Sequence, residues 1–243
     1  MRQNPPPTER AKLLREDEFD ICPMNRICQL VIFLWLGLAA VAAPDPQRFE
    51  REILAFEVAD KTNPPPQNAI LFLGSSSIRK WATLARDFPA HKVINRGFGG
   101  SMVSDSVYYF DRIVLPYKPK MIVFYAGSND LNAGKTAQTV VDDFKTLLGK
   151  VEAKLPETTV AFISVNASPS RWKDLAKVKD VNEQVASLAA HDKKLMFINT
   201  YTAMLDSEGK ARLELYLKDR LHPSARGYAI WTTIIAPFLD RAE

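Results

Sequence analysis

The sequence predicts an α/β protein, a three-layer α/β/α sandwich built on a parallel sheet of five strands. Short apolar runs of strand length alternate along residues 69–239 with longer segments whose apolar residues recur at helical spacing. The short runs are almost entirely apolar, which predicts strands that are buried on both faces, as in a parallel sheet covered by helices. In such sheets, reactive side chains gather at the carboxyl ends of the strands.

Five segments carry this strand pattern, and the second of them is the weakest. Their apolar residues are mostly β-branched or aromatic, as is typical of strands. In chain order they are AILFL (69–73), KVIN (92–95), MIVFY (121–125), TVAFISV (159–165) and LMFI (195–198).

Four segments carry a helical pattern. In residues 48–61 the apolar side chains form a stripe that ends before a run of prolines, and we expect this helix to pack across the sheet. Residues 136–155 and 173–190 each place apolar residues on one face, and a last helix follows Ser224, its expected N-cap. The stripe of the first helix comprises Phe49, Ile53, Leu54 and either Phe56 or Val58.

Composition limits the classes of protein that this chain can belong to. It has 243 residues, of which 47% are hydrophobic and 25% charged, as in a globular protein with one full core. The net charge is +4, but the 32 basic residues are scattered among 28 acids, so we expect a mildly basic surface and no nucleic-acid partner. Cys22 and Cys28 both precede Ala43, so a chain processed there has no disulfide, thiolate catalysis or cysteine-ligated zinc.

The first 43 residues differ from the rest of the chain. Residues 30–43 read LVIFLWLGLAAVAA, which is typical of a signal-peptide core and is too short to span a bilayer comfortably. We expect cleavage near Ala42 or Ala43 and a secreted or periplasmic protein; the alternative is an uncleaved N-terminal membrane anchor. Residues 1–23 carry at least as many acids as bases, unlike a secretory signal, so Met24 is a candidate for the true start. The chain then divides into residues 1–43 (extension and signal peptide or anchor), 44–68 (helix and linker) and 69–243 (catalytic domain).

Three loops after predicted strands carry candidate functional groups. GSSSI (74–78) follows the first strand, and its glycine allows a sharp turn that could present a serine hydroxyl, although taken alone the three serines are more typical of a cap on the next helix. NRGFGGS (95–101) could aim backbone N–H groups at a ligand or form a simple glycine-rich turn. In GSND (127–130), Asn129 either bonds its own backbone or directs its amide at an oxyanion.

A fourth motif, DRLHP (219–223), precedes the last helix. The three-residue separation of Asp219 and His222 places their side chains on the same side of one turn. The carboxylate can then hold one imidazole nitrogen while the other faces a serine hydroxyl, although a surface ion pair or a cap would give the same pattern. Taken together, the four motifs supply a nucleophile, a base, an orienting acid and oxyanion donors, which favours nucleophilic catalysis.

The order GSSS, NRGFGG, GSND and DRLHP resembles the SGNH (GDSL-like) hydrolase superfamily, and GSSSIRKW looks like its GSSSI-type branch. The resemblance covers about residues 69–239 and implies a flavodoxin-like sandwich, which agrees with the strand pattern. It implies that Ser76 is the nucleophile and His222 the general base and then acid, oriented by Asp219. The oxyanion hole would comprise the N–H groups of Ser76 and Gly100 and the Asn129 side chain.

The sequence departs from the common pattern of that superfamily at two positions. Ser75 stands where the common branch has an aspartate, and Ser101 where another aspartate is frequent, so support of the loops must differ. The choice of Ser76 over Ser75 and Ser77 rests on motif alignment alone.

The resemblance implies a serine ester hydrolase that needs no metal or organic cofactor. We expect it to act on a short-chain or O-acetyl ester, which a carbohydrate could carry. The alternatives are a lysophospholipase or thioesterase, or a non-catalytic envelope- or carbohydrate-binding domain with the same fold. We expect Arg171 and Trp172 to line the cleft, His91 and His191 to lie at the surface, and Trp81, Tyr108, Tyr109 and Phe110 to be core or helix-face residues.

Overall fold

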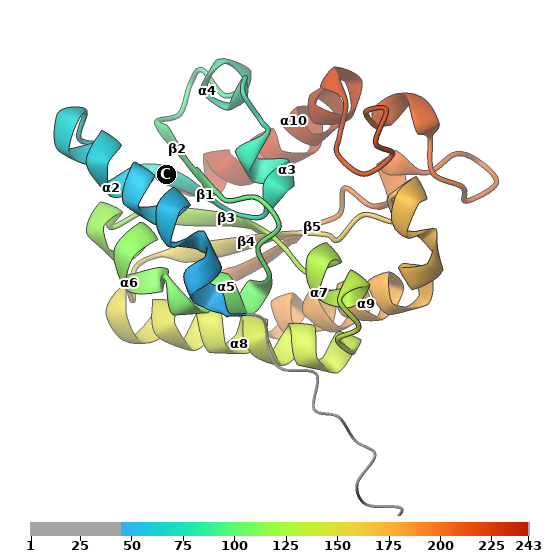
Figure 1. The fold of residues 1–243 in the computed structure, drawn as a ribbon, viewed down its shortest axis with the longest axis horizontal. Helices are drawn as coiled ribbons and strands as arrows, with labels where there is room; N and C mark the ends of the chain where they lie inside the picture. The colour runs from blue at the N-terminus through green and yellow to red at the C-terminus, as the bar shows by residue number, and fades with distance from the viewer. Residues whose placement is uncertain (1–44, 243) are drawn as a thin grey trace, which may run out of the picture. The chain divides into compact units, whose positions relative to one another are not determined.

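A parallel β-sheet forms the centre of the protein (Figure 1). The computed structural model describes residues 45–242. The strand order is β2-β1-β3-β4-β5, and every neighbouring pair is parallel. The direction in which strands are added therefore reverses between β1 and β3, where parallel α/β sheets open a crevice at the strands' carboxyl ends. All five predicted strands are confirmed, as β1 (Ile70–Gly74), β2 (Val93–Gly97), β3 (Met121–Tyr125), β4 (Thr159–Ile163) and β5 (Leu195–Ile198).

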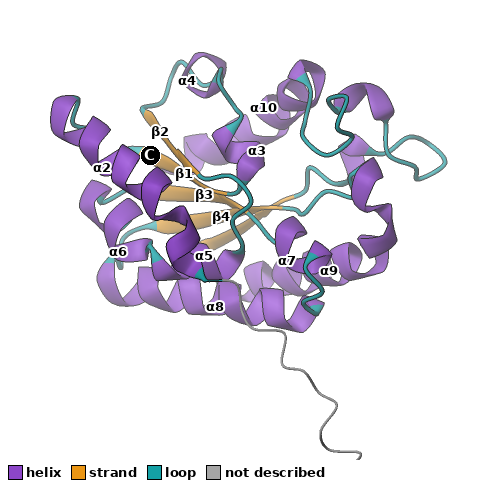
Figure 2. Cartoon of the chain, viewed as in Figure 1, coloured by secondary structure: helices purple, strands orange, loops and turns teal. Residues whose placement is uncertain are grey.

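Helices cover both faces of this sheet, which confirms the three-layer α/β/α sandwich (Figure 2). One face carries η1 (Pro46–Phe49), α2 (Glu50–Thr62), α5 (Val103–Tyr108), α6 (Phe110–Ile113), α8 (Ala137–Lys154) and α9 (Leu175–His191). The other carries α3 (Ser76–Arg79), α4 (Leu84–Asp87) and α10 (Ala225–Leu239). Short connecting helices are η2 (Leu115–Tyr117), α7 (Ser128–Asn132), η3 (Pro169–Asp174), η4 (Thr202–Met204) and η5 (Leu213–Leu215), and η6 (Asp240–Ala242) follows α10.

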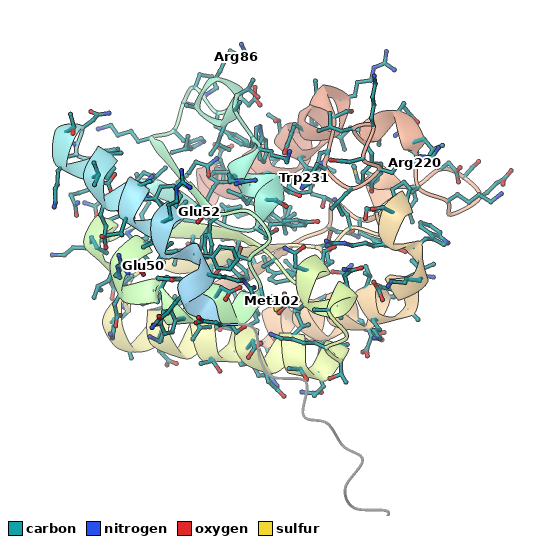
Figure 3. The ribbon with its side chains drawn as sticks, in the orientation of Figure 1. Glu50, Glu52, Arg86, Met102, Arg220 and Trp231 are labelled. Carbon is teal, nitrogen blue, oxygen red and sulfur yellow. The ribbon has the colours of Figure 1, made fainter. Side chains whose placement is uncertain are left out.

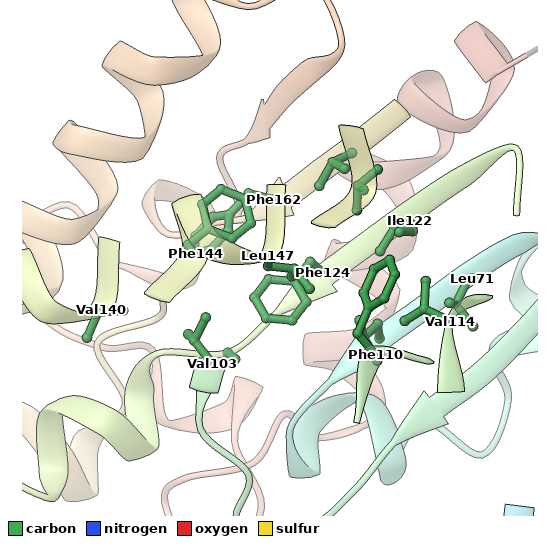
Figure 4. Packing of buried hydrophobic residues seen from close by; sticks show 14 of the residues in the cluster. Leu71, Val103, Phe110, Val114, Ile122, Phe124, Val140, Phe144, Leu147 and Phe162 are labelled. Carbon is green, nitrogen blue, oxygen red and sulfur yellow. The ribbon is translucent and has the colours of Figure 1, made fainter. Parts of the chain in front are cut away.

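Two cores, one on each face of the sheet, hold the layers together. Figure 4 shows the larger one, in which Phe124 of β3 stacks on Phe144 of α8 with ring centroids 5.6 Å apart. On the other face, Trp81 stacks on Tyr228 of α10, with ring centroids 4.9 Å apart. These side chains are almost completely buried, and they belong to the two cores that pack α8 and α10 against opposite faces of the sheet.

The predicted helices are present, and the first one has a narrower buried face than we expected. The predicted helices 136–155 and 173–190 correspond to α8 and α9, and the Ser224 side chain caps α10 by accepting the N–H of Gly227. In η1 and α2, Phe49, Ile53 and Phe56 face the core, at spacings of four and three residues. Leu54 and Val58 lie off this line and are 46% and 61% exposed.

The isolated histidines and the aromatic residues lie where the sequence predicts, with one exception, His91. Trp81, Tyr109 and Phe110 are buried, and Tyr108 ends α5 with a 53% exposed side chain, so the first three are core residues and Tyr108 is a helix-face residue, as predicted. His191 is exposed as expected, whereas the imidazole of His91 is only 7% exposed, and its Nε2 lies 3.2 Å from Asp240 Oδ1.

The predicted signal peptide or anchor lies outside the described residues, as do Met24, Cys22 and Cys28. Among residues 45–242, no helix is long and apolar enough to cross a membrane.

Candidate active site

A glycine at the end of β1 determines where the GSSSI loop begins. Gly74 has φ +139°, and a Cβ atom there would lie 2.0 Å from the carbonyl oxygen of Tyr125 on β3. Only glycine lets the two backbones approach so closely, and the Ser75 N–H then donates to that same oxygen at 2.9 Å. Helix α3 begins at Ser76, whose N–H, as the first of the helix, has no partner within it.

The structure brings Ser76, His222 and Asp219 together at the crevice. The Oγ of Ser76 lies 2.8 Å from His222 Nε2, and His222 Nδ1 lies 2.7 Å from Asp219 Oδ2. Ser75 and Ser77 are buried, and Ser76 is half-exposed, so Ser76 is the serine of the three that meets the imidazole. With the Nδ1 proton directed at the carboxylate, Nε2 is the acceptor for the serine hydroxyl.

A tight turn holds Asp219 against His222. Arg220 adopts a left-handed conformation with φ +55° in the loop before α10 (Figure 3). Asp219 Oδ1 then accepts the backbone N–H groups of Leu221 and His222 at 2.9 and 3.0 Å, while Oδ2 stays on the imidazole. Burial raises the pKa of Asp219, but the hydrogen bonds from the His222 side chain and from the two backbone N–H groups outweigh it and lower the pKa to about 2. The carboxylate is therefore ionised at neutral pH.

The glycine-rich loop after β2 presents Gly100 to solvent beside this group. Gly100 has φ +82° and is exposed, and among residues 45–242 its N–H makes no hydrogen bond. Ser101 is fully buried, and its Oγ donates to the carbonyl oxygens of Phe98 at 3.0 Å and Gly74 at 3.3 Å. The serine that replaces the frequent aspartate thus ties this loop to the end of β1.

Asn129, on the short helix α7 after β3, has its side chain held at both ends. Its Nδ2 donates to the carbonyl oxygen of Ser101 at 2.8 Å, and its Oδ1 accepts from Arg171 Nη2 at 2.8 Å. Arg171 also donates to Ser128 Oγ at 2.8 Å. The amide therefore faces the glycine-rich loop and does not bond its own backbone, which argues against the first of the two alternatives for Asn129, while its role as an oxyanion donor stays a prediction.

Two buried carboxylates support the glycine-rich loop from below, and sequence reasoning did not identify either. Asp130 is fully buried, lies 3.3 Å from the Val103 N–H through each oxygen, and is paired with Lys135 Nζ at 2.9 Å. Asp105 accepts the N–H of Met102 at 2.7 Å (Met102 is labelled in Figure 3) and is paired with Arg48 Nη2 at 3.0 Å. Asp130 stands inside the GSND motif, whereas nothing in the sequence marks Asp105.

Trp172 lies beside the site on a separate surface groove. It follows Arg171 on η3, whose Ser170 N–H donates to the carbonyl oxygen of Arg220 at 3.0 Å. The groove is lined by Pro169, Trp172, Asp206, Lys210, Ala211, Arg212, Leu213 and Glu214.

In the described part of the chain, no group of three or more His, Cys, Asp or Glu residues is placed to hold a metal ion.

The all-parallel sandwich and the four motif loops at its crevice are those of the SGNH hydrolase class, as the sequence predicted. The sequence model of the GDSL-like Lipase/Acylhydrolase family matches residues 69–230, more than half of the chain, and the chain belongs to that family. It is a carboxylic ester hydrolase. No curated protein matches the chain.

Solved structures share the fold over most of their length. A GDSL-like lipase from Bacteroides thetaiotaomicron VPI-5482 is 23% identical, with a TM-score of 0.66, and the match covers 82% of this chain and 98% of that one. A lipase/acylhydrolase from Enterococcus faecalis is 23% identical, with a TM-score of 0.58, covering 71% and 95%. A carbohydrate esterase family 3 protein from Talaromyces cellulolyticus is 16% identical, with a TM-score of 0.58, covering 71% and 96%. At these identities the likeness concerns the fold.

Proposed function

We propose that the protein hydrolyses esters through a covalent acyl-enzyme in which Ser76 is the nucleophile. The observation that carries the proposal is the continuous relay from Ser76 Oγ to His222 Nε2, 2.8 Å, and from His222 Nδ1 to Asp219 Oδ2, 2.7 Å. Both distances are those of hydrogen bonds that transfer or orient a proton.

In the first step, Ser76 Oγ attacks the ester carbonyl carbon while His222 Nε2 takes its proton. The protonated imidazole is stabilised by the ionised Asp219 and then gives the proton to the departing alcohol as the carbon–oxygen bond breaks. In the second step, a water molecule loses a proton to His222 and attacks the acyl carbon. The acid is released, and Ser76 recovers its hydrogen.

The negative oxygen of each tetrahedral intermediate needs donors that are already in place. The N–H groups of Ser76 and Gly100 and the Asn129 amide are the candidates, and they come from the loops after β1, β2 and β3. The Gly100 N–H is unpaired among the described residues, so it can bind an oxyanion without first breaking a bond.

We propose a short-chain or O-acetyl ester as the substrate, carried on a carbohydrate outside the cytoplasm. Ser76 is half-exposed and Gly100 exposed, so an ester on a large molecule can reach the relay. The neighbouring groove combines the Trp172 ring with charged side chains, a combination that suits a sugar ring and its hydroxyls. The Talaromyces protein that shares the fold is named as a carbohydrate esterase.

The mechanism is tested with Ser76→Ala, Ser75→Ala and Ser77→Ala on p-nitrophenyl acetate. We expect the first variant alone to lose turnover and labelling by a fluorophosphonate, because only Ser76 contacts His222. Full activity of Ser76→Ala would refute the mechanism. An unlabelled wild-type protein would favour a non-catalytic binding domain.

The substrate class is tested with p-nitrophenyl esters of increasing length together with acetylated glycans. We expect kcat/KM to be highest for acetate and for glycan acetates. A maximum at octanoate or longer would instead favour a lysophospholipase or thioesterase.

A further inference from the structure

Arg171 makes two hydrogen bonds to the first two residues of the short helix α7, Ser128 and Asn129. Its Nη1 donates to Ser128 Oγ and its Nη2 to Asn129 Oδ1, both at 2.8 Å. It reaches them from η3, after β4, so two short helices that are distant in sequence meet at this guanidinium. Arg171 does not touch the Ser76–His222–Asp219 relay, so the proposed mechanism leaves its function open.

The Asn129 amide has four hydrogen-bonding positions, two lone pairs on its oxygen and two N–H groups on its nitrogen. The oxygen accepts one hydrogen bond, from Arg171 Nη2, and one N–H donates to the carbonyl oxygen of Ser101, both at 2.8 Å. One N–H remains, on the nitrogen that faces the glycine-rich loop. An amide turned over by 180° would direct its oxygen there, where it would repel a developing oxyanion.

Arg171 opposes that reversed orientation because a guanidinium carries donors only. If the amide turned over, its NH₂ group would meet the Arg171 donors and its oxygen would meet the Ser101 carbonyl, so both hydrogen bonds would be lost. Arg171 is half-buried and, within residues 45–242, makes no ion pair closer than 4.0 Å. Its positive charge therefore also polarises the amide toward the hole.

We propose that Arg171 is a positioning residue of the oxyanion hole, which fixes the Asn129 amide with its free N–H directed at the reacting carbonyl. The inference rests on the proposed function, because it assigns Arg171 a task only if Asn129 is an oxyanion donor.

The test compares Arg171→Met and Arg171→Lys with a control, Lys173→Met, which removes an exposed cation from the same helix. Loss of a complete oxyanion donor lowers kcat by ~10² to 10³. In Arg171→Met the hydrogen bond from Asn129 Nδ2 to the Ser101 carbonyl remains and still holds the amide in part. We therefore expect kcat to fall by less, roughly 10- to 100-fold, with KM unchanged. Arg171→Lys keeps the charge but cannot make both hydrogen bonds, and its kcat should lie between those of wild type and Arg171→Met. Lys173→Met should match wild type.

The decisive measurement repeats Arg171→Met in an Asn129→Ala background. If Arg171 acts through the amide, the double variant is no slower than Asn129→Ala alone. If Arg171→Met lowered kcat in the Asn129→Ala background by the same factor as in wild type, Arg171 would support the fold instead of acting through the amide. An unchanged kcat in Arg171→Met would also overturn the inference. If Arg171→Met does not fold, Arg171→Lys is tested in the same two backgrounds with the same criteria. Ser76→Ala separates the hypotheses, because its full activity would refute the mechanism itself.

Discussion

Replacing Asp130 by asparagine tests how the buried charge beneath the glycine-rich loop is held. Lys135 Nζ pairs with two carboxylates at almost equal distances, 2.9 Å to Asp130 Oδ1 and 2.8 Å to Asp143 Oδ2. The two acids differ in their surroundings, since the Asp130 side chain is fully buried and that of Asp143 is 29% exposed. Asp143→Asn is therefore a matched control that removes the same charge from the same lysine.

The expected magnitudes follow from burial. Removing one partner of a buried pair costs about 3 to 5 kcal/mol in the free energy of unfolding, and asparagine recovers part of this because its oxygen can still accept the Val103 N–H. We expect Asp130→Asn to lose about 2 to 4 kcal/mol. The partly exposed Asp143 contributes as a surface pair does, so Asp143→Asn should lose about 1 kcal/mol or less.

Urea unfolding measures the free energies of unfolding of Asp130→Asn and Asp143→Asn. The kcat on p-nitrophenyl acetate reports whether the glycine-rich loop keeps its position. A shift of the loop that carries Gly100 should lower kcat in Asp130→Asn, by up to ~10²-fold for a displacement of about 1 Å, and leave it unchanged in Asp143→Asn. If Asp143→Asn destabilised the protein as much as Asp130→Asn, burial would not be what distinguishes the two pairs.

Three further predictions concern the turn before α10, the glycines and the groove. Asp219→Asn should lower kcat by ~10² to 10⁴. Folding lowers the pKa of Asp219 from the ordinary 3.8 to about 2, so the higher melting temperature of wild type relative to Asp219→Asn should disappear as the pH falls through that interval. A difference in melting temperature that persisted below pH 2 would contradict this. Gly74→Ala, with its Cβ 2.0 Å from the Tyr125 oxygen, should lower the free energy of unfolding by about 3 kcal/mol or more. Gly100→Ala has no atom within 4 Å of its Cβ and should lower it by only about 1 to 2 kcal/mol. Equal losses of unfolding free energy in urea would refute the steric argument. Trp172→Ala should raise KM for acetylated glycans and leave KM for p-nitrophenyl acetate unchanged, and a parallel rise in both would exclude a sugar-binding role.

Strand positions could be predicted from the sequence because a strand buried on both faces leaves a local signature. The apolar runs at 69–73 and 121–125 coincide with β1 and β3 to within one residue. Local pattern also located α8 and α9 but overestimated the buried face of α2. Whether Leu54 meets the core depends on the angle at which the helix packs, and that angle is a tertiary property.

The functional loops were predictable as motifs, whereas the contacts that hold them were not. Ser76, Asn129, Asp219 and His222 were found because their spacing and order match a family. The choice of Ser76 over its neighbours rested on alignment until the geometry placed Ser76 alone against the imidazole. The pairing of Arg171 with Asn129 joins residues 42 apart along the chain, and no local pattern encodes a contact of that kind.

The ion pair between Arg48 and Asp105 has a practical consequence for anyone who expresses this enzyme. Family matching begins at residue 69, so trimming recombinant protein to that boundary would delete Arg48 together with Ile53, which is fully buried. Asp105 would still accept the Met102 N–H but would lose its ion pair with Arg48, and the apolar surface that Ile53 covers would be exposed to water. Shortened versions should start no later than Asp45, with any purification tag placed ahead of that point.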